Sequence, residues 1–484
     1  MTNQSATWGL SALTHRLEAI RSHNDERAHL RDGYITSNRY FYGLVEQVLR
    51  FIVDPGKRVL QLGCQTGRLL EMLEPSKGVG MDYSGAFIDI AREKHPEYEL
   101  KRQEGTEIPE MEPFDYVLVS NLGECLDVLD QFEEIKKKVA DRDTLIVIYV
   151  YNRLWEPLVI LAEWLGIKYP QPNQNWLSMH SVKSMLTLSG YDPIRTYRTV
   201  LMPKYVPLLS WFANRVLAKL PLLRLLCMVN VITARPRPEP LKASGVTVSV
   251  IVPCKDEEGN IEAAVTRVPE MGAGTEIIFC DDRSEDGTVA EVRRMQKEFP
   301  EKNIKLVDGP GICKAKNVWA GFEAASGDVL MILDADLTVM PEKLPQFFNA
   351  LIDGRGGFVN GTRMVYPMQH EAMRTLNMIG NKFFSTVFSL ILGQSITDTL
   401  CGTKVIWRDD WKRLKGLLGT WGIDDRWGDY ELLFGAAKLN LKIIDLPVHY
   451  QRRIEGETKM SNRLWNASIM MRMCIVAFWK FRMY

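Results

Sequence analysis

The sequence lacks an excess of charge of either sign. It has 60 Lys and Arg against 60 Asp and Glu among 484 residues, so its formal net charge is zero. A protein that binds nucleic acid concentrates positive charge, and no overall surplus of that kind exists here. We therefore expect no nucleic acid among its partners.

Cysteine is scarce and shows no pattern. The 8 cysteines are scattered along the chain, and no two of them form a CxxC pair. This spacing argues against the common zinc motifs and against the disulfide framework of small secreted proteins. We expect reduced and buried thiols.

Long apolar runs without charges are also missing. Three stretches are unusually apolar, at 205–232, 376–396 and 464–484, yet each contains Lys or Arg. A membrane-spanning helix needs about 20 apolar residues without charges, so we expect none of the three to cross a bilayer. The N-terminal residues lack the apolar core and the cleavage site of a signal peptide. We therefore expect a cytoplasmic protein.

The last of these stretches belongs to a tail that is rich in cations. From residue 451 onward the chain has seven basic residues (Arg452, Arg453, Lys459, Arg463, Arg472, Lys480 and Arg482) and two acidic ones (Glu455 and Glu457). This balance suits an anionic membrane surface, whereas the alternative is a core helix packed on a sheet. Both interpretations of the 461–484 tail stay open, and with them a peripheral position on the inner face of the plasma membrane.

One segment interrupts an otherwise regular alternation of strands and helices. It is 234–245, ARPRPEPLKASG, where three X-Pro units disfavour helix and favour an extended connector. Short β-branched runs alternate with amphipathic stretches on both sides of it, which is typical of a parallel sheet with helices on both faces. We predict two successive doubly wound α/β domains, at 1–233 (core 54–200) and 246–460, followed by an amphipathic C-terminal helix.

Glycines and an acid mark a binding edge in the first domain. Gly63 and Gly67 stand between the predicted strand RVLQL and the predicted helix GRLLEML, and the next strand, GVGMD, ends at Asp82. At this edge of a doubly wound sheet glycine lets the backbone approach a nucleotide, and a carboxylate can accept both ribose hydroxyls. Residues 54–200 resemble the class I S-adenosylmethionine-dependent methyltransferases. The resemblance implies a Rossmann-like methyltransferase fold in which Gly63 and Gly67 line the methionine end of the cofactor and Asp82 holds its ribose.

Two positions depart from that family's pattern. Gln61 stands where the family usually has an acidic residue, and Gln65 stands where it has a third glycine. The side chain of Gln65 falls where the cofactor would lie closest to the backbone. His180 and Tyr149 are candidates for a general base by residue type alone. The first domain is either an active methyltransferase or a catalytically silent binding or scaffold module.

Acidic residues also follow the first strands of the second domain. The predicted strand that ends at Pro253 is soon followed by Glu257, and the next strand ends at Asp281 and Asp282. The two sets therefore lie at the same edge of the sheet. Carboxylates at such an edge can accept hydrogen bonds from a base N–H and from ribose hydroxyls, so we expect them to bind a nucleotide donor.

A third strand of this domain leads into the motif DAD. Because side chains alternate along a strand, Asp334 and Asp336 would share a face and could jointly hold one divalent cation. The motifs VIVPCKDEEGNI, DDRSEDGT, GDVLMILDADL, NGTR, DTLCGTKV and DYELLFGAAKLNLKIIDLPVHY, in this order, resemble the family 2 glycosyltransferases with the GT-A fold. The resemblance is greatest to the group similar to dolichyl-phosphate mannose synthase, and it covers residues 246–460.

The resemblance implies an inverting transfer of a sugar from a nucleotide-sugar. It assigns residues that surround the nucleoside (Pro253, Glu257 and Asp282), that bind ribose, diphosphate and Mg²⁺ or Mn²⁺ (Asp334 and Asp336), and that reach a phosphate (Arg363 and Lys459). Basic side chains suit the last role because their hydrogen bonds to phosphate oxygens are charge-assisted. The metal would assist the departure of the nucleoside diphosphate.

The acceptor is open at this point. A sugar hydroxyl would need a carboxylate to remove its proton, with Asp429 or Glu431 as the candidates. A polyprenyl phosphate is already largely ionised and needs no base. Cations would then matter more, and the chain offers four of them (Arg363, Arg374, Lys382 and Lys404).

Both resemblances on one chain are typical of bacterial fusions that take part in cell-surface glycan synthesis. We expect an enzyme that moves a sugar to a polyprenyl phosphate or glycan acceptor at the inner membrane surface, and whose N-terminal half methylates the same glycolipid. One alternative is the same enzyme with a silent N-terminal half. The other is a nucleotide-binding regulator that transfers nothing.

Overall fold

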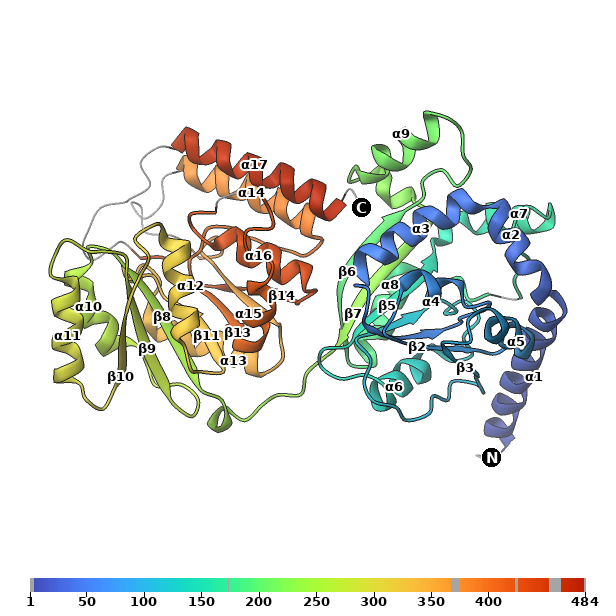
Figure 1. Cartoon of the computed structure of the whole chain (residues 1–484), viewed down its shortest axis with the longest axis horizontal. Coiled ribbons are helices and arrows are strands. Elements are labelled where there is room, and N and C mark those ends of the chain that lie inside the picture. The colour runs from blue at the N-terminus through green and yellow to red at the C-terminus, as the bar shows by residue number, and fades with distance from the viewer. Residues whose placement is uncertain (1–3, 173, 367–374, 423–424, 452–462, 483–484) are drawn as a thin grey trace. The chain divides into compact units, whose positions relative to one another are not determined.

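The chain folds into two α/β units. The computed structural model describes residues 4–172, 174–366, 375–422, 425–451 and 463–482. The two units are Met1–Arg237 and Pro238–Met483, which we call the N-terminal unit and the C-terminal unit (Figure 1). Each unit contains one seven-stranded sheet with helices around it (Figure 1).

The N-terminal sheet has the strand order β3-β2-β1-β4-β5-β7-β6. The first five strands in this order run parallel, and β7 runs antiparallel to both of its neighbours. The strands are β1 (Arg58–Leu62), β2 (Lys77–Asp82), β3 (Glu99–Arg102), β4 (Tyr116–Val119), β5 (Leu145–Tyr151), β6 (Tyr191–Thr199) and β7 (Val229–Pro236). The α-helices are α1 (Gln4–Arg27), α2 (Arg31–Ser37), α3 (Arg39–Ile52), α4 (Arg68–Leu73), α5 (Gly85–Lys94), α6 (Val128–Lys138), α7 (Glu156–Trp164), α8 (Met179–Leu188) and α9 (Leu209–Arg215).

Apolar side chains on both faces of these strands account for the helices on both sides. Val59 packs in one core with residues of α3 and α4, whereas its neighbour Leu60 packs in another core with residues of α6 and α8. Successive side chains of a strand point to opposite faces, so a strand that is apolar throughout buries both. The predicted doubly wound arrangement of this domain is confirmed.

The segment that we predicted as a connector starts inside the sheet. β7 extends to Pro236, which pairs with Tyr191 of β6. Residues 234–236 are therefore part of a strand, and the first X-Pro unit is extended because it continues the antiparallel ladder. The division between the two units falls after Arg237.

The C-terminal sheet has the order β10-β9-β8-β11-β13-β12-β14, with β13 antiparallel to β11 and β12 and the other pairs parallel. The strands are β8 (Val248–Cys254), β9 (Thr275–Asp281), β10 (Asn303–Asp308), β11 (Val329–Ile332), β12 (Phe358–Thr362), β13 (Lys404–Trp407) and β14 (Ile443–Pro447). The α-helices are α10 (Glu258–Arg267), α11 (Thr288–Glu298), α12 (Lys314–Ala324), α13 (Leu344–Ile352), α14 (Thr375–Leu392), α15 (Arg408–Lys415), α16 (Asp429–Lys438) and α17 (Arg463–Arg482).

Two cores again lie on opposite faces of this sheet. Val250 packs with residues of α10, α11 and α13, whereas Ile251 packs with residues of α12, α14, α16 and α17. The second doubly wound domain is thus confirmed as well. The parallel strands β8, β9 and β11 end at one edge, so the loops after them are brought together there.

The C-terminal helix α17 lies against α14 (Figure 1). Met473, Ala477 and Phe481 are buried on one side of α17, whereas Trp465 and Trp479 are largely exposed. One face of this helix is therefore part of the core, whereas the other face exposes large apolar side chains, so the predicted helix is present but is not amphipathic. Within the described ranges no helix is long and apolar enough to cross a membrane.

The packing of α14 gives a first prediction. The ring of Phe388 is fully buried between Tyr430 and Phe434, with centroid distances of 5.0 Å and 5.3 Å. Phe388→Ala should lower the free energy of unfolding of the C-terminal unit by about 3–5 kcal/mol, since it leaves a cavity. The control is Phe383→Ala on the exposed side of α14, which should cost less than about 1 kcal/mol. Equal losses in denaturant titrations of the two variants would contradict this packing.

Candidate functional site

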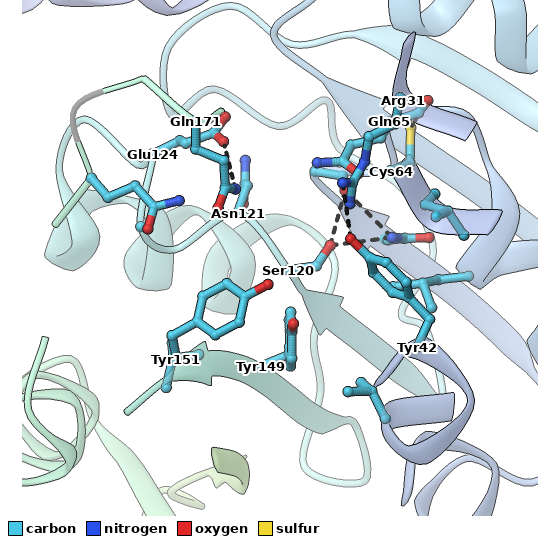
Figure 2. Close-up of a pocket in the computed structure, with 18 of the residues that line it drawn as sticks. Arg31, Tyr42, Cys64, Gln65, Ser120, Asn121, Glu124, Tyr149, Tyr151 and Gln171 are labelled. Atoms are coloured by element: carbon cyan, nitrogen blue, oxygen red, sulfur yellow. Dashed lines mark hydrogen bonds between the residues drawn. The ribbon is translucent and has the colours of Figure 1, made fainter. Parts of the chain in front are cut away.

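A pocket opens at the carboxyl edge of the N-terminal sheet (Figure 2). It lies beyond the ends of β1, β4 and β5, where the sequence predicted a ligand site. Its wall includes polar and aromatic residues from many segments (Arg31, Tyr42, Gln61, Gln65, Ser120, Asn121, Glu124, Tyr149, Tyr151, Lys168, Gln171 and Asn175). Most of them lie in segments that carry no recognisable motif, so the sequence did not indicate them.

The two motif glycines have conformations that other residues avoid. Gly63 has φ +76°, and a Cβ atom there would lie 2.4 Å from the Cβ of Asn121. Gly67 has φ +83°, and its Cβ would lie 2.7 Å from the ring of His95. Gly63 lines the pocket, whereas Gly67 is the N-cap residue that precedes α4. The turn therefore requires glycine at both positions.

The unexpected Gln65 is part of the pocket wall. It has φ +48°, and its side-chain oxygen accepts a hydrogen bond of 2.7 Å from Nε of Arg31. Arg31 also donates to the hydroxyl of Tyr42 at 3.0 Å and lies over the rings of Tyr42 and Tyr169. Gln65 thus holds a guanidinium group at the pocket, and Figure 2 shows this cluster on one side of the cavity.

Gln61 has a structural role at the position where an acid was expected. Its amide nitrogen donates to the carbonyl oxygen of Gly63 at 3.4 Å and to the hydroxyl of Ser120 at 3.1 Å. Ser120 in turn donates to the carbonyl oxygens of Leu62 and Gly63. An amide can make these donations and a carboxylate cannot, so Gln61 fixes the glycine turn.

Asp82 lies at the end of β2 but is not among the residues that line the pocket. Its carboxylate accepts hydrogen bonds from the backbone N–H of Gln65 at 2.9 Å and of Ser84 at 3.0 Å. Asp25 of α1 accepts from the Ser84 hydroxyl and from the N–H of Ala86, so α1 lies next to this region. Burial raises the pKa of Asp82 to about 7.

The candidates for a general base are separated by the fold. Tyr149 lines the pocket, and burial raises its pKa well above the ordinary value. His180 is exposed on α8 and is not a pocket residue. Glu124 is a pocket carboxylate that the sequence did not single out, and it accepts hydrogen bonds from Asn24 at 3.2 Å and Gln171 at 3.3 Å.

In the C-terminal unit, the first acids lie at the predicted edge of the sheet. Asp281 ends β9 opposite Cys254 of β8, and its carboxylate accepts from the N–H of Ser284. Asp282 is buried, and its Oδ1 has no hydrogen-bond partner within the described part of the chain. Pro253 and Glu257 are half-buried nearby, at the end of β8 and at the start of α10.

The two acids of the DAD motif lie in a turn and not on the strand, because β11 ends at Ile332. The turn places Asp334 beside Lys314 at the start of α12, with 2.5 Å between Oδ1 and Nζ. Burial raises the pKa of Asp334, but the charge of Lys314 outweighs it, so that the pKa lies below its usual value. Asp336 accepts hydrogen bonds from the N–H and the hydroxyl of Thr338.

Only one of the two candidate bases faces this cluster. Asp429, the first residue of α16, accepts a hydrogen bond of 2.6 Å from Nζ of the buried Lys404, and it also acts electrostatically on Lys314. Glu431 accepts from the N–H of Gly419 at 2.7 Å, on a different side of α16. The fold thus brings Asp429 to Asp334 and Lys314, and it does not bring Glu431.

The predicted phosphate ligands differ in position. Arg363 donates to the fully buried Asp398 through Nε at 2.7 Å and Nη2 at 2.8 Å, and it acts on Asp334 electrostatically. Lys382 is exposed on α14. Lys459 and Arg374 lie outside the described residues. Lys314 and Asp398 are the members of this cluster that the sequence analysis missed.

Comparison with known proteins identifies the C-terminal domain. Residues 249–414 match the family model described as Glycosyl transferase family 2. Dolichol-phosphate mannosyltransferase of Saccharomyces cerevisiae is 40% identical over 121 residues, which are 24% of this chain and 44% of that protein. Dolichyl-phosphate hexose transferase of Haloferax volcanii is 27% identical over 226 residues, which are 46% of this chain and 90% of that protein. The resemblance of the C-terminal domain to family 2 glycosyltransferases is confirmed.

Other matches are shorter or structural. The chain spans about a third of the Aeromonas hydrophila undecaprenyl-phosphate 4-deoxy-4-formamido-L-arabinose transferase, with 32% identity over 22% of this chain and 34% of that protein. A Thermotoga maritima S-adenosylmethionine-dependent methyltransferase structure covers 45% of this chain and 99% of its own, with 13% identity and a TM-score of 0.36. Mycobacterium tuberculosis glucosyl-3-phosphoglycerate synthase, bound to Mn²⁺ and UDP, covers 49% and 80%, with 18% identity and a TM-score of 0.35.

The environment of Asp82 gives a prediction about pH. Its pKa is about 7 in the folded protein and about 3.9 in an unfolded chain. The folded state therefore binds more protons between these values, and stability should fall as pH rises from about 4 to about 7. Asp82→Asn cannot titrate, so the free energy of unfolding of this variant should fall less between pH ~5 and ~8. Equal changes in denaturant titrations of wild type and variant would contradict the burial of this carboxyl.

Proposed function

We propose that the C-terminal unit, which contains a family 2 glycosyl transferase domain, transfers a sugar from a nucleotide-sugar to a polyprenyl phosphate. The observation that carries the proposal is the cluster of alternating charges at the carboxyl edge of its sheet, where Asp334 pairs with Lys314 and Asp429 pairs with Lys404. Cations and carboxylates in close contact at a sheet edge suit a substrate that is itself highly charged.

The nucleotide half of the donor has candidate ligands on β8 and β9. The oxygen Oδ1 of Asp282 is buried and has no hydrogen-bond partner in the described ranges. A buried acceptor without a donor is costly, and a base N–H or a ribose hydroxyl would satisfy it. Asp281, Glu257 and Pro253 lie around the same edge and would complete the nucleoside site.

Two carboxylates are suited to a divalent cation. Within the described ranges no group of three or more His, Cys, Asp or Glu is arranged around a metal position. Mg²⁺ commonly takes one or two carboxylates and completes its shell with substrate phosphates and water, and Asp334 and Asp336 in one turn fit that need. When bound there, Mg²⁺ or Mn²⁺ would neutralise charge on the diphosphate leaving group. Lys314 is already a cation at this position.

The arrangement of the acids favours a phosphate acceptor over a sugar hydroxyl. A hydroxyl acceptor needs a carboxylate within hydrogen-bond reach to take its proton. Asp429 already accepts from Lys404, and Glu431 accepts from the backbone of Gly419. An ionised phosphate needs no base and instead needs cations. Asp398 holds Arg363 in a fixed orientation for that purpose.

For the N-terminal unit we propose S-adenosylmethionine binding and methyl transfer. The support is the glycine turn at Gly63, the polar pocket beyond it and the acid Asp82 at the end of β2. One observation favours the alternative of a silent module, because Asp82 does not line the pocket. Ribose binding would require this carboxylate to become accessible beside α1.

The place of action follows from the proposed acceptor. Polyprenyl phosphates reside in membranes, so the active site has to work at a membrane surface. The exposed face of α17 carries Trp465, Ile475 and Trp479, and the helix contains basic residues and no acidic ones. We propose that this face binds the inner surface of the plasma membrane, and that the product enters cell-surface glycan synthesis.

The glycosyltransferase proposal is tested by donor turnover. The full chain should release nucleoside diphosphate from one of a panel of UDP- and GDP-sugars when Mg²⁺ or Mn²⁺ and a short polyprenyl phosphate are present. Asp336→Asn keeps an oxygen for Thr338 but removes the charge, and it should reduce turnover by about 100-fold. The control Asp353→Ala lies on the surface after α13 and should be unaffected. Full activity of the Asp336→Asn variant would contradict the proposed role of the DAD motif.

The methyltransferase proposal is tested by calorimetry with S-adenosylmethionine. The full chain should bind it, and Asp82→Ala should weaken binding at least about tenfold because it loses the hydrogen bonds between the carboxyl group and the ribose. Asp89→Ala, on the exposed side of α5, is the matched control. A wild-type chain that turns over sugar donors but shows no heat with S-adenosylmethionine would support the silent module instead.

A further inference from the structure

The ammonium group of Lys314 interacts with three carboxylates of the C-terminal unit. Its Nζ lies 2.5 Å from Oδ1 of Asp334, and it also interacts electrostatically with Asp429 and Asp336. Burial lowers the pKa of Lys314, but the charges of these acids outweigh it, so that the pKa lies above its usual value. A fixed positive charge therefore lies beside the two acids that are the proposed ligands of Mg²⁺ or Mn²⁺.

The stability of the helix does not explain this lysine. Lys314 is the first residue of α12, and the first turn of this helix contains no acidic residue. The N-terminus of a helix carries a partial positive charge, so a lysine there is unfavourable unless carboxylates compensate it. The ion pair with Asp334 provides this compensation. Lys314 therefore belongs to the charged site rather than to the helix cap.

Asp334 is accessible to a metal ion from one side, and Lys314 lies on that side. Its Oδ2 packs closely against the backbone of Gly402, where an added Cβ atom would clash with this oxygen. A divalent cation that binds Asp334 therefore has to approach Oδ1, where it meets the ammonium group. Two cations in contact repel each other strongly, so binding of the metal requires Lys314 to leave.

Lys314 is the cation of this cluster that has room to move. The side chain of Lys404 is 1% exposed beside Asp429, and that of Arg363 is 11% exposed and is bound to Asp398. The side chain of Lys314 is 33% exposed. Lysine has a compact charge on a flexible stem, and its hydrogen bonds to phosphate oxygens are charge-assisted. The diphosphate of a nucleotide-sugar can therefore replace Asp334 as its partner.

We propose that Lys314 is the counter-ion of Asp334 in the free C-terminal unit, and that its ammonium group moves to the diphosphate when the donor binds. Oδ1 of Asp334 is then free for Mg²⁺ or Mn²⁺, so the unit takes up the metal with the donor and not before it. This inference rests on the proposed transfer from a nucleotide-sugar. It adds a role for Lys314, which keeps the metal out of the empty site.

The first test is a calorimetric titration of the full chain with Mn²⁺ in the absence of nucleotide. Lys314→Gln removes the charge but keeps a hydrogen-bond donor for Asp334, and it should bind Mn²⁺ at least about tenfold more tightly than the wild type does. Lys314→Gln/Asp334→Asn should lose this gain. Lys316→Gln, on another side of α12, is the matched control and should bind Mn²⁺ as the wild type does.

The second test is a titration with UDP and with GDP in the presence of EDTA. Lys314→Gln should weaken the binding of the nucleotide that the wild type prefers by at least about tenfold, because a charge-assisted hydrogen bond to the diphosphate is lost. Lys314→Arg keeps the charge and should behave as the wild type does in both titrations. A lysine that only supported the packing of α12 would not change the two affinities in opposite directions.

Lys314→Met is the second variant in case Lys314→Gln does not fold, and the same two changes are expected of it. An unchanged or weaker affinity of the folded variants for Mn²⁺ would overturn the inference. If the wild type also turns over nucleotide-sugars with metal, that result leaves the proposed transfer intact. If the wild type turns over no donor but the variants gain affinity for Mn²⁺ and lose affinity for the nucleotide, the role of Lys314 stands and the proposed transfer fails.

Discussion

When both faces of a parallel sheet are buried, the edges of the sheet are where polar side chains can gather to form a functional site. Successive residues such as Val59 and Leu60, or Val250 and Ile251, point into opposite apolar cores, so most side chains along these strands are apolar. Polar groups therefore gather beyond the carboxyl ends of the strands. The pocket of the N-terminal unit and the charged cluster of the C-terminal unit both follow from this constraint.

Charged side chains at such an edge are partly removed from water, so each of them needs a partner of opposite charge. The C-terminal unit has three such ion pairs, Lys314 with Asp334, Lys404 with Asp429, and Arg363 with Asp398. Burying an unpaired charge would cost several kcal/mol, so the pairs hold one another in place before any substrate arrives. The N-terminal unit instead surrounds its pocket with amides and with Arg31, which Gln65 and Tyr42 hold.

The strands, the glycine turn and the acids at the strand ends could be predicted because each depends on local sequence. Gly63 follows a buried strand and has a positive φ, as a tight turn in front of a helix requires. The glycosyltransferase family was likewise recognisable, because its motifs are short and ordered along the chain.

Other features depend on tertiary contacts that no local pattern reveals. Arg31 and Lys314 belong to no recognisable sequence motif. Their contacts with Gln65 and Asp334 form only because the fold brings distant segments together. Asp82 occupies the predicted position at the end of β2, yet backbone N–H groups bind its carboxylate and it does not line the pocket. The prediction that Asp334 and Asp336 lie on one face of a strand was also wrong, since β11 ends at Ile332, before both residues.

The lipid product shows most directly whether the chain transfers a sugar to a lipid phosphate. The full chain would be incubated with a nucleotide-sugar that it turns over, a divalent metal and a polyprenyl phosphate, and the lipid fraction analysed by mass spectrometry. If the proposed transfer takes place, the mass of the lipid phosphate should rise by that of one sugar residue joined through the phosphate. Free sugar and an unmodified lipid phosphate, despite turnover of the donor, would contradict it.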